Sequence, residues 1–263
     1  MQKPKSIFNW SGGKDSSIAL QKILESDSYD VSLLFTTINA KYDRVTQHGV
    51  RTQLLREQAR SIGIPLKTVA IPDTPTMKSY NNLMKKILSG LYREGFTHSI
   101  FGDISLEDLR QYREDRLAEA GFDGVFPLWK QNTAQLAQDF INDGFKAVVV
   151  CVDDALLDHS FSGRIYDEAF LRDLPDGVDP CGENGEFHTF VYDGPIFTKP
   201  VSWVPGEKVY RTYTPPARRN DEKGTDEDGN RDAHSEGDGF NCGSDQDERT
   251  QPGFWFCDLL PVA

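Results

Sequence analysis

The segment SGGKDSS at residues 11–17 gathers the side chains best suited to binding an anion. Gly12 and Gly13 let the backbone turn tightly and come close to a ligand. Lys14 adds a positive charge, and the serines offer hydroxyl donors. An apolar run precedes the segment and a helical pattern follows, so its N–H groups would open a helix, and helix N-termini attract anions. The pattern predicts a cradle for an anion the size of pyrophosphate.

Two other phosphate loops have a different spacing. The G-x-x-x-x-G-K-[ST] loop of triphosphate hydrolases needs an earlier glycine at a fixed distance from Gly13, and none is there. A dinucleotide fingerprint needs a third glycine where Ser16 or a neighbour stands. An ordinary glycine turn with a surface lysine is the remaining alternative, although S-G-G-K-D-S after a strand is a far more specific string than two isolated glycines.

A second group of polar residues lies in the segment GDISLEDLRQYREDRL, which begins at Gly102. Gly102 and Asp103 end a candidate strand, and in a parallel sheet that end would lie at the same edge as residues 11–17. We expect Asp103 to face the ligand, and Arg110 and Arg116 on the following helix to contact the substrate. The alternative for these side chains is a set of surface ion pairs at helical spacing.

A third group lies in the segment CGENGEFHTF, residues 181–190. Glu183, Glu186 and His188 stand within six residues and flank Asn184-Gly185, so two acids, an amide and an imidazole could meet in one turn. Such a group could bind magnesium, orient ammonia or act as a general base. The alternative is a polar turn that leads into a strand.

His48 stands where a helix is expected to open after the second strand. At this edge of the sheet it could contact the adenine or a phosphate of a nucleotide, and a solvated helix start is the alternative.

Short apolar runs alternate with helical patterns along the chain up to about residue 152. This alternation predicts an α/β architecture with a doubly wound parallel sheet. The expected strands are 6–10, 31–37, 66–71, 98–102, 124–127 and 147–152. The expected helices are 14–26, 48–62, 76–94, 105–120, 131–143 and 164–172. Residues 1–152 would form the domain that holds this parallel sheet, and residues 153–263 a smaller α+β domain. In the latter, 208–212 and the strand near the end would pair as a hairpin.

The chain of 263 residues is acidic, with a formal net charge of −12. Residues 216–250 hold eleven acids and five bases, a net charge of −6, and almost no large apolar side chains. We expect a disordered insertion there, an acidic interaction segment being the alternative. The chain lacks the basic stripe of a nucleic-acid binder, a membrane-spanning run and a secretion signal. Its four cysteines show no zinc-ligand spacing. These features predict a soluble cytoplasmic protein.

The string SGGKDS at residues 11–16 resembles the signature of the PP-loop ATP pyrophosphatases, a branch of the adenine nucleotide alpha-hydrolase-like fold. In enzymes with this loop, the β- and γ-phosphates leave as pyrophosphate while the substrate attacks the α-phosphate. The resemblance implies that the loop binds ATP with Mg2+. The residues it would assign to the nucleotide are Ser11, Gly12, Gly13, Lys14, Asp15, Ser16, Ser17, His48, Gly102 and Asp103.

Together with VFPLWKQNTAQL and CGENGEFHTFVYDGPIFTKPV, these motifs resemble the diphthine ammonia ligase family over nearly all of the chain up to residue 201. Glu183, Gly185, Glu186 and Thr189 would match the family's second-domain motif. Members adenylate the carboxylate of diphthine on an elongation factor, and ammonia then converts it to an amide. Asn184, Phe187 and His188 depart from the family pattern. They resemble a bacterial branch, which implies the same chemistry on an acceptor other than diphthine.

We therefore expect an ATP-dependent, AMP-forming amide ligase. Lys14 and the serines of the loop would hold the phosphates, and Asp15 would orient the loop or a magnesium water. Glu183, Glu186 and His188 would serve catalysis, and Asn184, Gly185 and Thr189 the acceptor substrate. The partners would be a small-molecule or protein-borne carboxylate and ammonia, with no nucleic acid and no membrane, and a homodimer stays open. The alternatives are a PP-loop enzyme that modifies tRNA and a non-catalytic nucleotide-binding protein.

Overall fold

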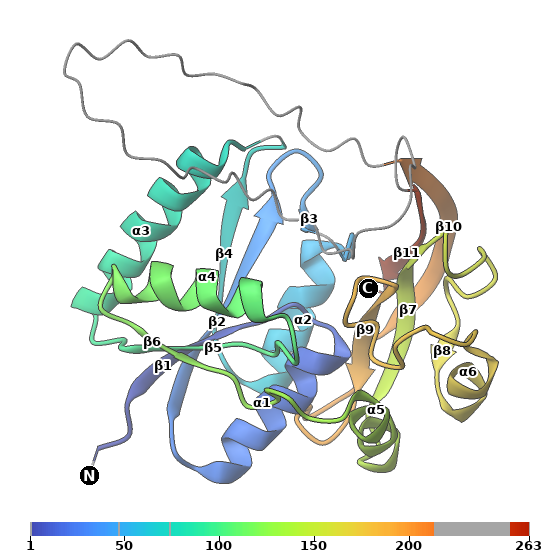
Figure 1. Ribbon diagram of the computed structural model, residues 1–263, viewed down its shortest axis with the longest axis horizontal. Helices are drawn as coiled ribbons and strands as arrows, with labels where there is room; N and C mark the ends of the chain where they lie inside the picture. Colours follow the sequence, from blue (N-terminus) through green and yellow to red (C-terminus); the bar gives the residue numbers. More distant parts are fainter. Residues whose placement is uncertain (1, 47, 74, 213–252, 263) are drawn as a thin grey trace.

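The apolar runs of the first half of the chain form one parallel sheet, in a computed structural model that describes residues 2–46, 48–73, 75–212 and 253–262. The parallel strands pair in the order β4-β2-β1-β5-β6 (Figure 1). Their bounds are β1 Lys5–Asn9, β2 Asp30–Asn39, β4 Leu66–Ile71, β5 His98–Ile100 and β6 Asp123–Val125. A short β3, Arg44–Val45, pairs antiparallel with the end of β2. The chain order reverses between β1 and β5, which makes that crevice the topological switch point.

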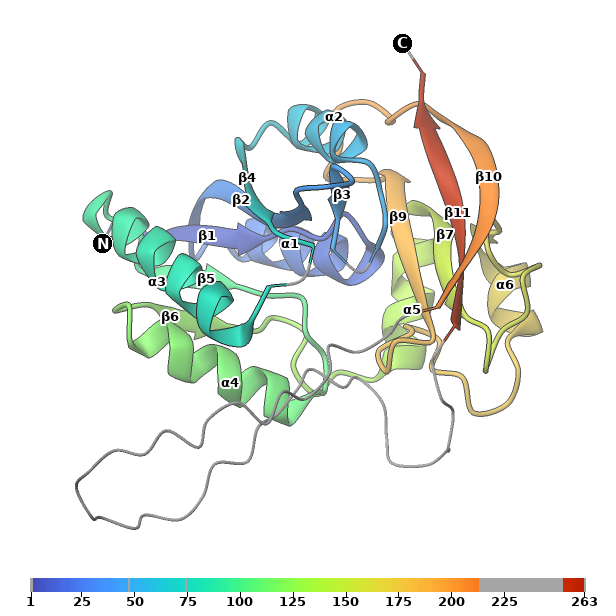
Figure 2. The same ribbon diagram turned by 90° about the horizontal axis from the view of Figure 1, so that it is seen from above.

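Helices cover both faces of this sheet, as the alternation of side chains along its strands requires. Phe8 packs with α1 and α2 in one buried cluster, whereas its neighbour Ile7 packs with α3 and α4 in another. Figure 2 shows these two pairs of helices on opposite sides of the strands. The bounds are α1 Lys14–Ser26, α2 Thr52–Ile62, α3 Met77–Arg93, α4 Glu107–Ala118 and α5 Thr133–Asn142. The doubly wound α/β fold expected from the sequence is confirmed.

The later strands form a second, antiparallel sheet around β7. β7 pairs with β8, β9 and β11, and β10 pairs with β11. Its strands are β7 Lys146–Asp153, β8 Ile165–Tyr166, β9 Phe187–Asp193, β10 Trp203–Thr212 and β11 Gly253–Pro261. The expected β10–β11 hairpin is confirmed, with Thr212 opposite Gly253. The segment 216–250, expected to be disordered, lies outside the described residues.

Two expectations for this region were wrong. The strand 147–152 was assigned to the parallel sheet, but it is β7 at the centre of the second sheet, so the change of sheet comes before β7. Its run of buried valines is typical of a strand covered on both faces, and such a run does not tell which sheet it joins. The helix expected over 164–172 begins later, as α6 Glu168–Asp173, because β8 occupies its first residues. The domain boundary at residue 152 stays a prediction.

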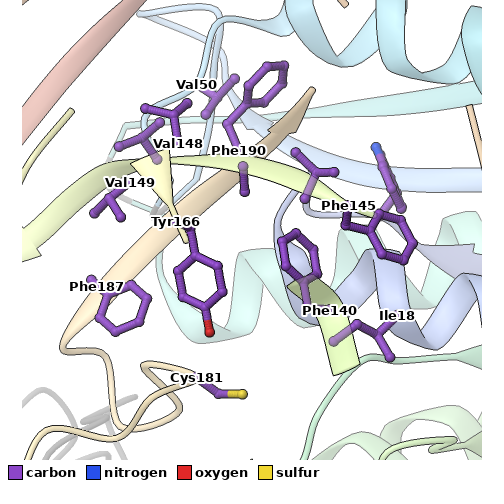
Figure 3. Packing of buried hydrophobic residues seen from close by; sticks show 14 of the residues in the cluster. Ile18, Val50, Phe140, Phe145, Val148, Val149, Tyr166, Cys181, Phe187 and Phe190 are labelled. Carbon is purple, nitrogen blue, oxygen red and sulfur yellow. The ribbon is translucent and has the colours of Figure 1, made fainter. Parts of the chain in front are cut away.

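The two sheets share one apolar core, in which residues of α1 and α5 pack with strands of the second sheet. Ile18 of α1 and Phe140 of α5 belong to the same buried cluster as Val148 and Phe190 of the second sheet (Figure 3). Burial of this much apolar surface provides the main force that holds the sheets together. In the described residues, no helix is both long and apolar enough to cross a membrane.

Candidate active site

The loop between β1 and α1 is a compact turn that contains Gly12 and Gly13. Gly12 has a left-handed φ of 81°, and Gly13 is the extended N-cap of α1. The hydroxyl of Ser11 accepts the N–H of Gly13 at 3.2 Å, while the hydroxyls of Ser16 and Ser17 each donate to the Gly13 carbonyl at 2.9 Å. Because a glycine cap has no side chain, it offers no acceptor to the first-turn amides. The Lys14 amide donates instead to the hydroxyl of Thr189, so the amides of Asp15 and Ser16 are the ones that an anion could bind.

Gly102 brings the end of β5 against this loop. A Cβ atom at Gly102 would lie 3.0 Å from the amide nitrogen of Ser16 and 3.1 Å from the carbonyl carbon of Asp15. Only glycine permits this approach. The residues that follow β1 and β5 therefore line one crevice at the switch point, as the sequence predicted.

The turn and strand of the second sheet close the crevice from the other side. The amide of Lys14 donates to the hydroxyl of Thr189 at 3.0 Å, and the amide of Val191 donates to the carbonyl of Gly12 at 2.9 Å. Thr189, predicted as a substrate residue, thus contacts the loop itself. The predicted phosphate segment and the predicted acceptor segment are therefore in direct contact.

Gln58 of α2 contacts both the loop and β9, and sequence reasoning missed it. Its side chain is fully buried. Its Nε2 donates to the carbonyls of Gly12 at 3.0 Å and Val191 at 2.5 Å, and its Oε1 accepts the indole N–H of Trp10 at 3.0 Å. The available signal was a polar residue on the apolar face of α2, one turn after the buried Leu54 and Leu55.

The side chain of Lys14 is buried and points toward the 181–189 turn. Its ammonium contacts both carboxylate oxygens of Asp15, at 2.7 and 2.9 Å, and the carbonyl oxygen of Cys181. Burial lowers the pKa of Lys14, but Asp15, the Cys181 thiol and Glu183 outweigh it, so the net pKa lies above its ordinary value. Lys14 is therefore a charged group held between the two sheets.

Glu183 and Glu186 have different surroundings although they stand in one turn. Oε1 of Glu183 accepts the amides of Ile104 at 3.0 Å and Ser105 at 2.8 Å, which follow β5. Burial raises its pKa to about 7, against the opposing effect of these amides. Glu186 is buried, and its oxygens accept N–H groups of Asp179 and Asn184 within its own turn. Glu183 thus reaches the crevice, while Glu186 shapes the turn that carries Asn184 and Gly185.

The imidazole rings of His48 and His188 contact each other in a tilted arrangement beside the loop. Their centroids are 4.6 Å apart, and a Cβ atom at Gly13 would lie 3.0 Å from Cε1 of His48. Burial is the largest cause that lowers the pKa of each, so both rings are neutral near pH 7. Nδ1 of His48 lies 3.3 Å from the Thr189 carbonyl oxygen, which fits a proton on Nδ1. His48 does not open α2 as expected, because the left-handed Gly49 and the extended Arg51 delay the helix to Thr52.

The residues predicted on the segment after β5 divide into two groups. Asp103 lies at the crevice, where burial raises its pKa and Asp15 adds to the effect. Its partner is Arg113 of α4, 2.7 Å away, which was not predicted as a site residue. Arg110 instead packs between Phe126 and Trp129, and Arg116 pairs with Glu119 in the last turn of α4. The structure does not bring these two arginines to the loop.

No group of three or more His, Cys, Asp or Glu side chains that could hold a metal ion occurs among the residues the structure describes. Of the carboxylates near the loop, Asp15 is partly exposed and stands in the first turn of α1. One carboxylate beside phosphate oxygens is a common setting for Mg2+, so the donor set fits an ion that arrives with a nucleotide.

A doubly wound sheet with an S-G-G-K-D-S loop at its switch point, closed by a second sheet, defines an α/β protein of the PP-loop class. Residues 4–122 match the family model of the diphthamide synthase N-terminal domain, and residues 132–214 match that of the diphthamide synthase C-terminal domain. The chain belongs to the diphthamide synthase family.

Curated relatives carry the name diphthine--ammonia ligase. The Danio rerio protein is 26% identical over 218 residues, which cover 73% of this chain and 83% of that relative. The Bos taurus and Mus musculus proteins are 35% and 34% identical over 79 residues. Those 79 residues are 28% of this chain and 30% of each mammalian protein, so the chain matches less than a third of their length.

Proposed function

We propose that this protein is an ATP-dependent amide ligase that forms AMP and pyrophosphate. The observation that carries the proposal is the hydrogen bond between the Lys14 amide and the Thr189 hydroxyl, which joins the phosphate loop to the 181–189 turn. An adenylating ligase needs the α-phosphate and the acceptor carboxylate side by side, and a shared site supplies that proximity. The family and the names of the relatives support the same class.

The reaction would have two steps. A carboxylate oxygen of the acceptor attacks the α-phosphorus, the bond between the α-phosphorus and the bridging oxygen breaks, and pyrophosphate leaves. The nitrogen of ammonia then attacks the acyl carbon, the bond from that carbon to the AMP oxygen breaks, and nitrogen loses a proton. The amides of the first turn of α1 and the charge of Lys14 would stabilise the departing pyrophosphate, because fixed dipoles act strongly in a buried site.

Mg2+ would neutralise phosphate charge when it is bound with ATP, and Asp15 would hold it. Lys14 already contacts Asp15 in this structure, so the carboxylate and the ammonium would act together on the phosphates. Ser11 and Ser16, whose hydroxyls lie 3.0 Å apart, would complete the cradle.

The two histidines and Glu183 would serve the second step. Ammonium must lose a proton before nitrogen can attack, and a neutral imidazole is a suitable acceptor. With its proton on Nδ1, His48 keeps a free lone pair on Nε2. Glu183, with a pKa of about 7, would exchange protons near neutrality. Glu186 would act as a positioning residue, since its oxygens are engaged within the turn.

The acceptor would be a carboxylate that lies between the histidine pair and Asn184. The relatives are named for diphthine, and His188 departs from the motif of the diphthine ammonia ligases. We therefore propose an acceptor other than diphthine, either a small molecule or a carboxylate carried by a protein.

The test is to measure nucleotide products with ATP, Mg2+, ammonium and a mixture of carboxylic acid metabolites. The proposal expects AMP and pyrophosphate in equal amounts, and ADP with phosphate would contradict it. Lys14→Ala should lower the rate by roughly a hundredfold, whereas Lys22→Ala, on the same helix, should not. Circular dichroism and melting curves must show that both variants are folded, because Lys14 is buried. A wild-type signal that survives in folded Lys14→Ala would refute the assignment of the loop.

A further inference from the structure

Asp258 lies in β11, beyond the last residue of either family match. Its Oδ1 accepts hydrogen bonds from Arg44 at 2.8 Å and from Nε of Arg51 at 3.1 Å. Its Oδ2 accepts a second bond from Arg51 at 2.6 Å. The contact with Arg51 is therefore bidentate, the geometry in which a guanidinium binds a carboxylate most specifically.

Both arginines belong to the turn that carries His48, which we define as residues 44–46 and 48–51. Arg44 also donates to the carbonyl of Gly49 at 2.8 Å. A backbone hydrogen bond also spans the turn, because the amide of Val45 donates to the carbonyl of Val50 at 2.8 Å. Asp258 thus holds both ends of the His48 turn through two side chains.

Phe256 supports the same turn from the same face of β11. Gly49 has a φ of 68°, and a Cβ atom there would lie 3.0 Å from the ring of Phe256. Residues two apart in a strand point to one face, so Phe256 and Asp258 both face the turn. β11 therefore packs against the turn that carries His48.

We propose that Asp258 is a positioning residue that holds the His48 turn against the phosphate loop. The consequence for nucleotide binding rests on the proposed function, because it requires that ATP occupies the loop. Near His48 stand Asp15, Lys14 and His188, together with the Thr189 carbonyl. A displaced turn would move His48 away from all four.

Asp258 keeps its charge under working conditions. Burial raises its pKa, but the hydrogen bonds and charges of Arg51 and Arg44 outweigh burial and bring the pKa down to about 2. Asp258 therefore contributes no pH dependence near neutrality.

The first test needs no ligand. Histidine signals of the full-length protein are titrated by NMR in wild type, Asp258→Asn, Asp258→Glu and Asp193→Asn. The last variant breaks a similar ion pair, with Lys146 at 2.9 Å, that lies away from the turn. We expect Asp258→Asn to bring the His48 titration back toward that of free histidine, Asp258→Glu to restore it in part, and Asp193→Asn to leave it unchanged.

The second test measures the affinity for ATP with Mg2+ by calorimetry, well below the melting temperature of each variant. Asp258→Asn should weaken ATP binding by roughly threefold to tenfold, because the turn that carries His48 is no longer held in one position. Asp193→Asn should leave ATP binding unchanged. If Asp258→Asn does not fold, Arg51→Lys removes the bidentate contact and takes its place. Unchanged His48 titration and unchanged affinity in a folded variant would overturn the inference. If wild type binds no ATP, the proposed function fails, and the titration still decides the inference.

Discussion

Oε1 of Glu183 accepts the backbone N–H of Ser105 at 2.8 Å. Glu183 lies in the turn before β9 of the second sheet, and Ser105 lies in the loop after β5 of the first. This hydrogen bond therefore joins the two sheets at the switch point. The same carboxylate has a pKa raised to about 7 by burial. The contact therefore depends on pH in the range where the protein would work.

Replacing Glu183 with glutamine should remove one pH dependence of stability. Folding raises the pKa of Glu183 from 4.5 to about 7, so its contribution to stability is complete below pH 4.5 and is lost as the pH rises to about 7. Between about pH 5 and pH 8, wild type should therefore lose about 1–3 kcal/mol more unfolding free energy than Glu183→Gln. Urea denaturation at several pH values measures the difference.

Glu94→Gln is the control, because it removes the charge of an exposed glutamate. It should follow wild type at each pH. Parallel pH curves for wild type and Glu183→Gln would show that Glu183 is not a titrating group of the folded protein.

Titration of His188 should make the unfolding free energy fall as the pH falls, which is the opposite of the effect of Glu183. Burial lowers its pKa well below 6.5, with His48 and Lys14 adding to the effect, so the unfolded state binds the proton first as the pH falls. Stability is lost below pH 6.5, and His188→Gln should lose about 1 kcal/mol less than wild type on going to about pH 5. The exposed His159→Gln should not differ from wild type. If His188→Gln lost as much unfolding free energy as wild type at about pH 5, the ring of His188 would not be held neutral in the folded protein.

Gln58→Leu should destabilise the protein strongly. The substitution removes the Gln58 hydrogen bonds to the Val191 carbonyl and to the indole N–H of Trp10, together with one of the two bonds that the Gly12 carbonyl accepts. Each buried group left unsatisfied costs about 1–3 kcal/mol, so a loss of about 2 kcal/mol or more in unfolding free energy is expected. The measurement is urea denaturation, with the exposed Gln135→Leu as the matched control. A loss below that of the control would mean that water or a rearranged side chain replaces Gln58.

Gly102→Ala should disturb the phosphate loop through the backbone. The added Cβ atom would lie 3.0 Å from the Ser16 amide nitrogen, and relief of such crowding costs about 1–3 kcal/mol. The affinity for ATP should fall together with stability. Gly90→Ala in α3, where nothing lies within 4 Å of the new atom, should leave affinity unchanged and raise stability by about 0.5–1 kcal/mol. Wild-type affinity in Gly102→Ala would argue against close contact between the two loops.

The parallel sheet and its helices could be predicted because each strand and helix has its own apolar period. The strand 66–71 and the helix 14–26 were predicted with the bounds that the structure has. The placement of β7 could not be predicted, since its buried run fits the centre of either sheet. The pairing partner, not the local sequence, decides that choice.

The site was predictable where short segments carry their own signal and not where the fold joins distant ones. Residues 11–17 and 181–190 were identified by composition and spacing, and the structure places them in contact. Gln58 gave only the signal of a polar residue on an apolar helix face, and Asp258 gave none, because both act through partners far away in the sequence. Arg110 and Arg116 were chosen because their helix follows a strand end at the sheet edge, but that position does not set the distance of a side chain from the loop.

Hydrogen exchange of the full-length protein with and without ATP and Mg2+ tests the central claim most directly, which is that the phosphate loop and the 181–189 turn form one binding site. The account predicts slower exchange in peptides that cover residues 11–17 and in peptides that cover residues 181–189, at the same nucleotide concentration. Protection of the loop alone, with no change in the turn at saturating ATP, would contradict it.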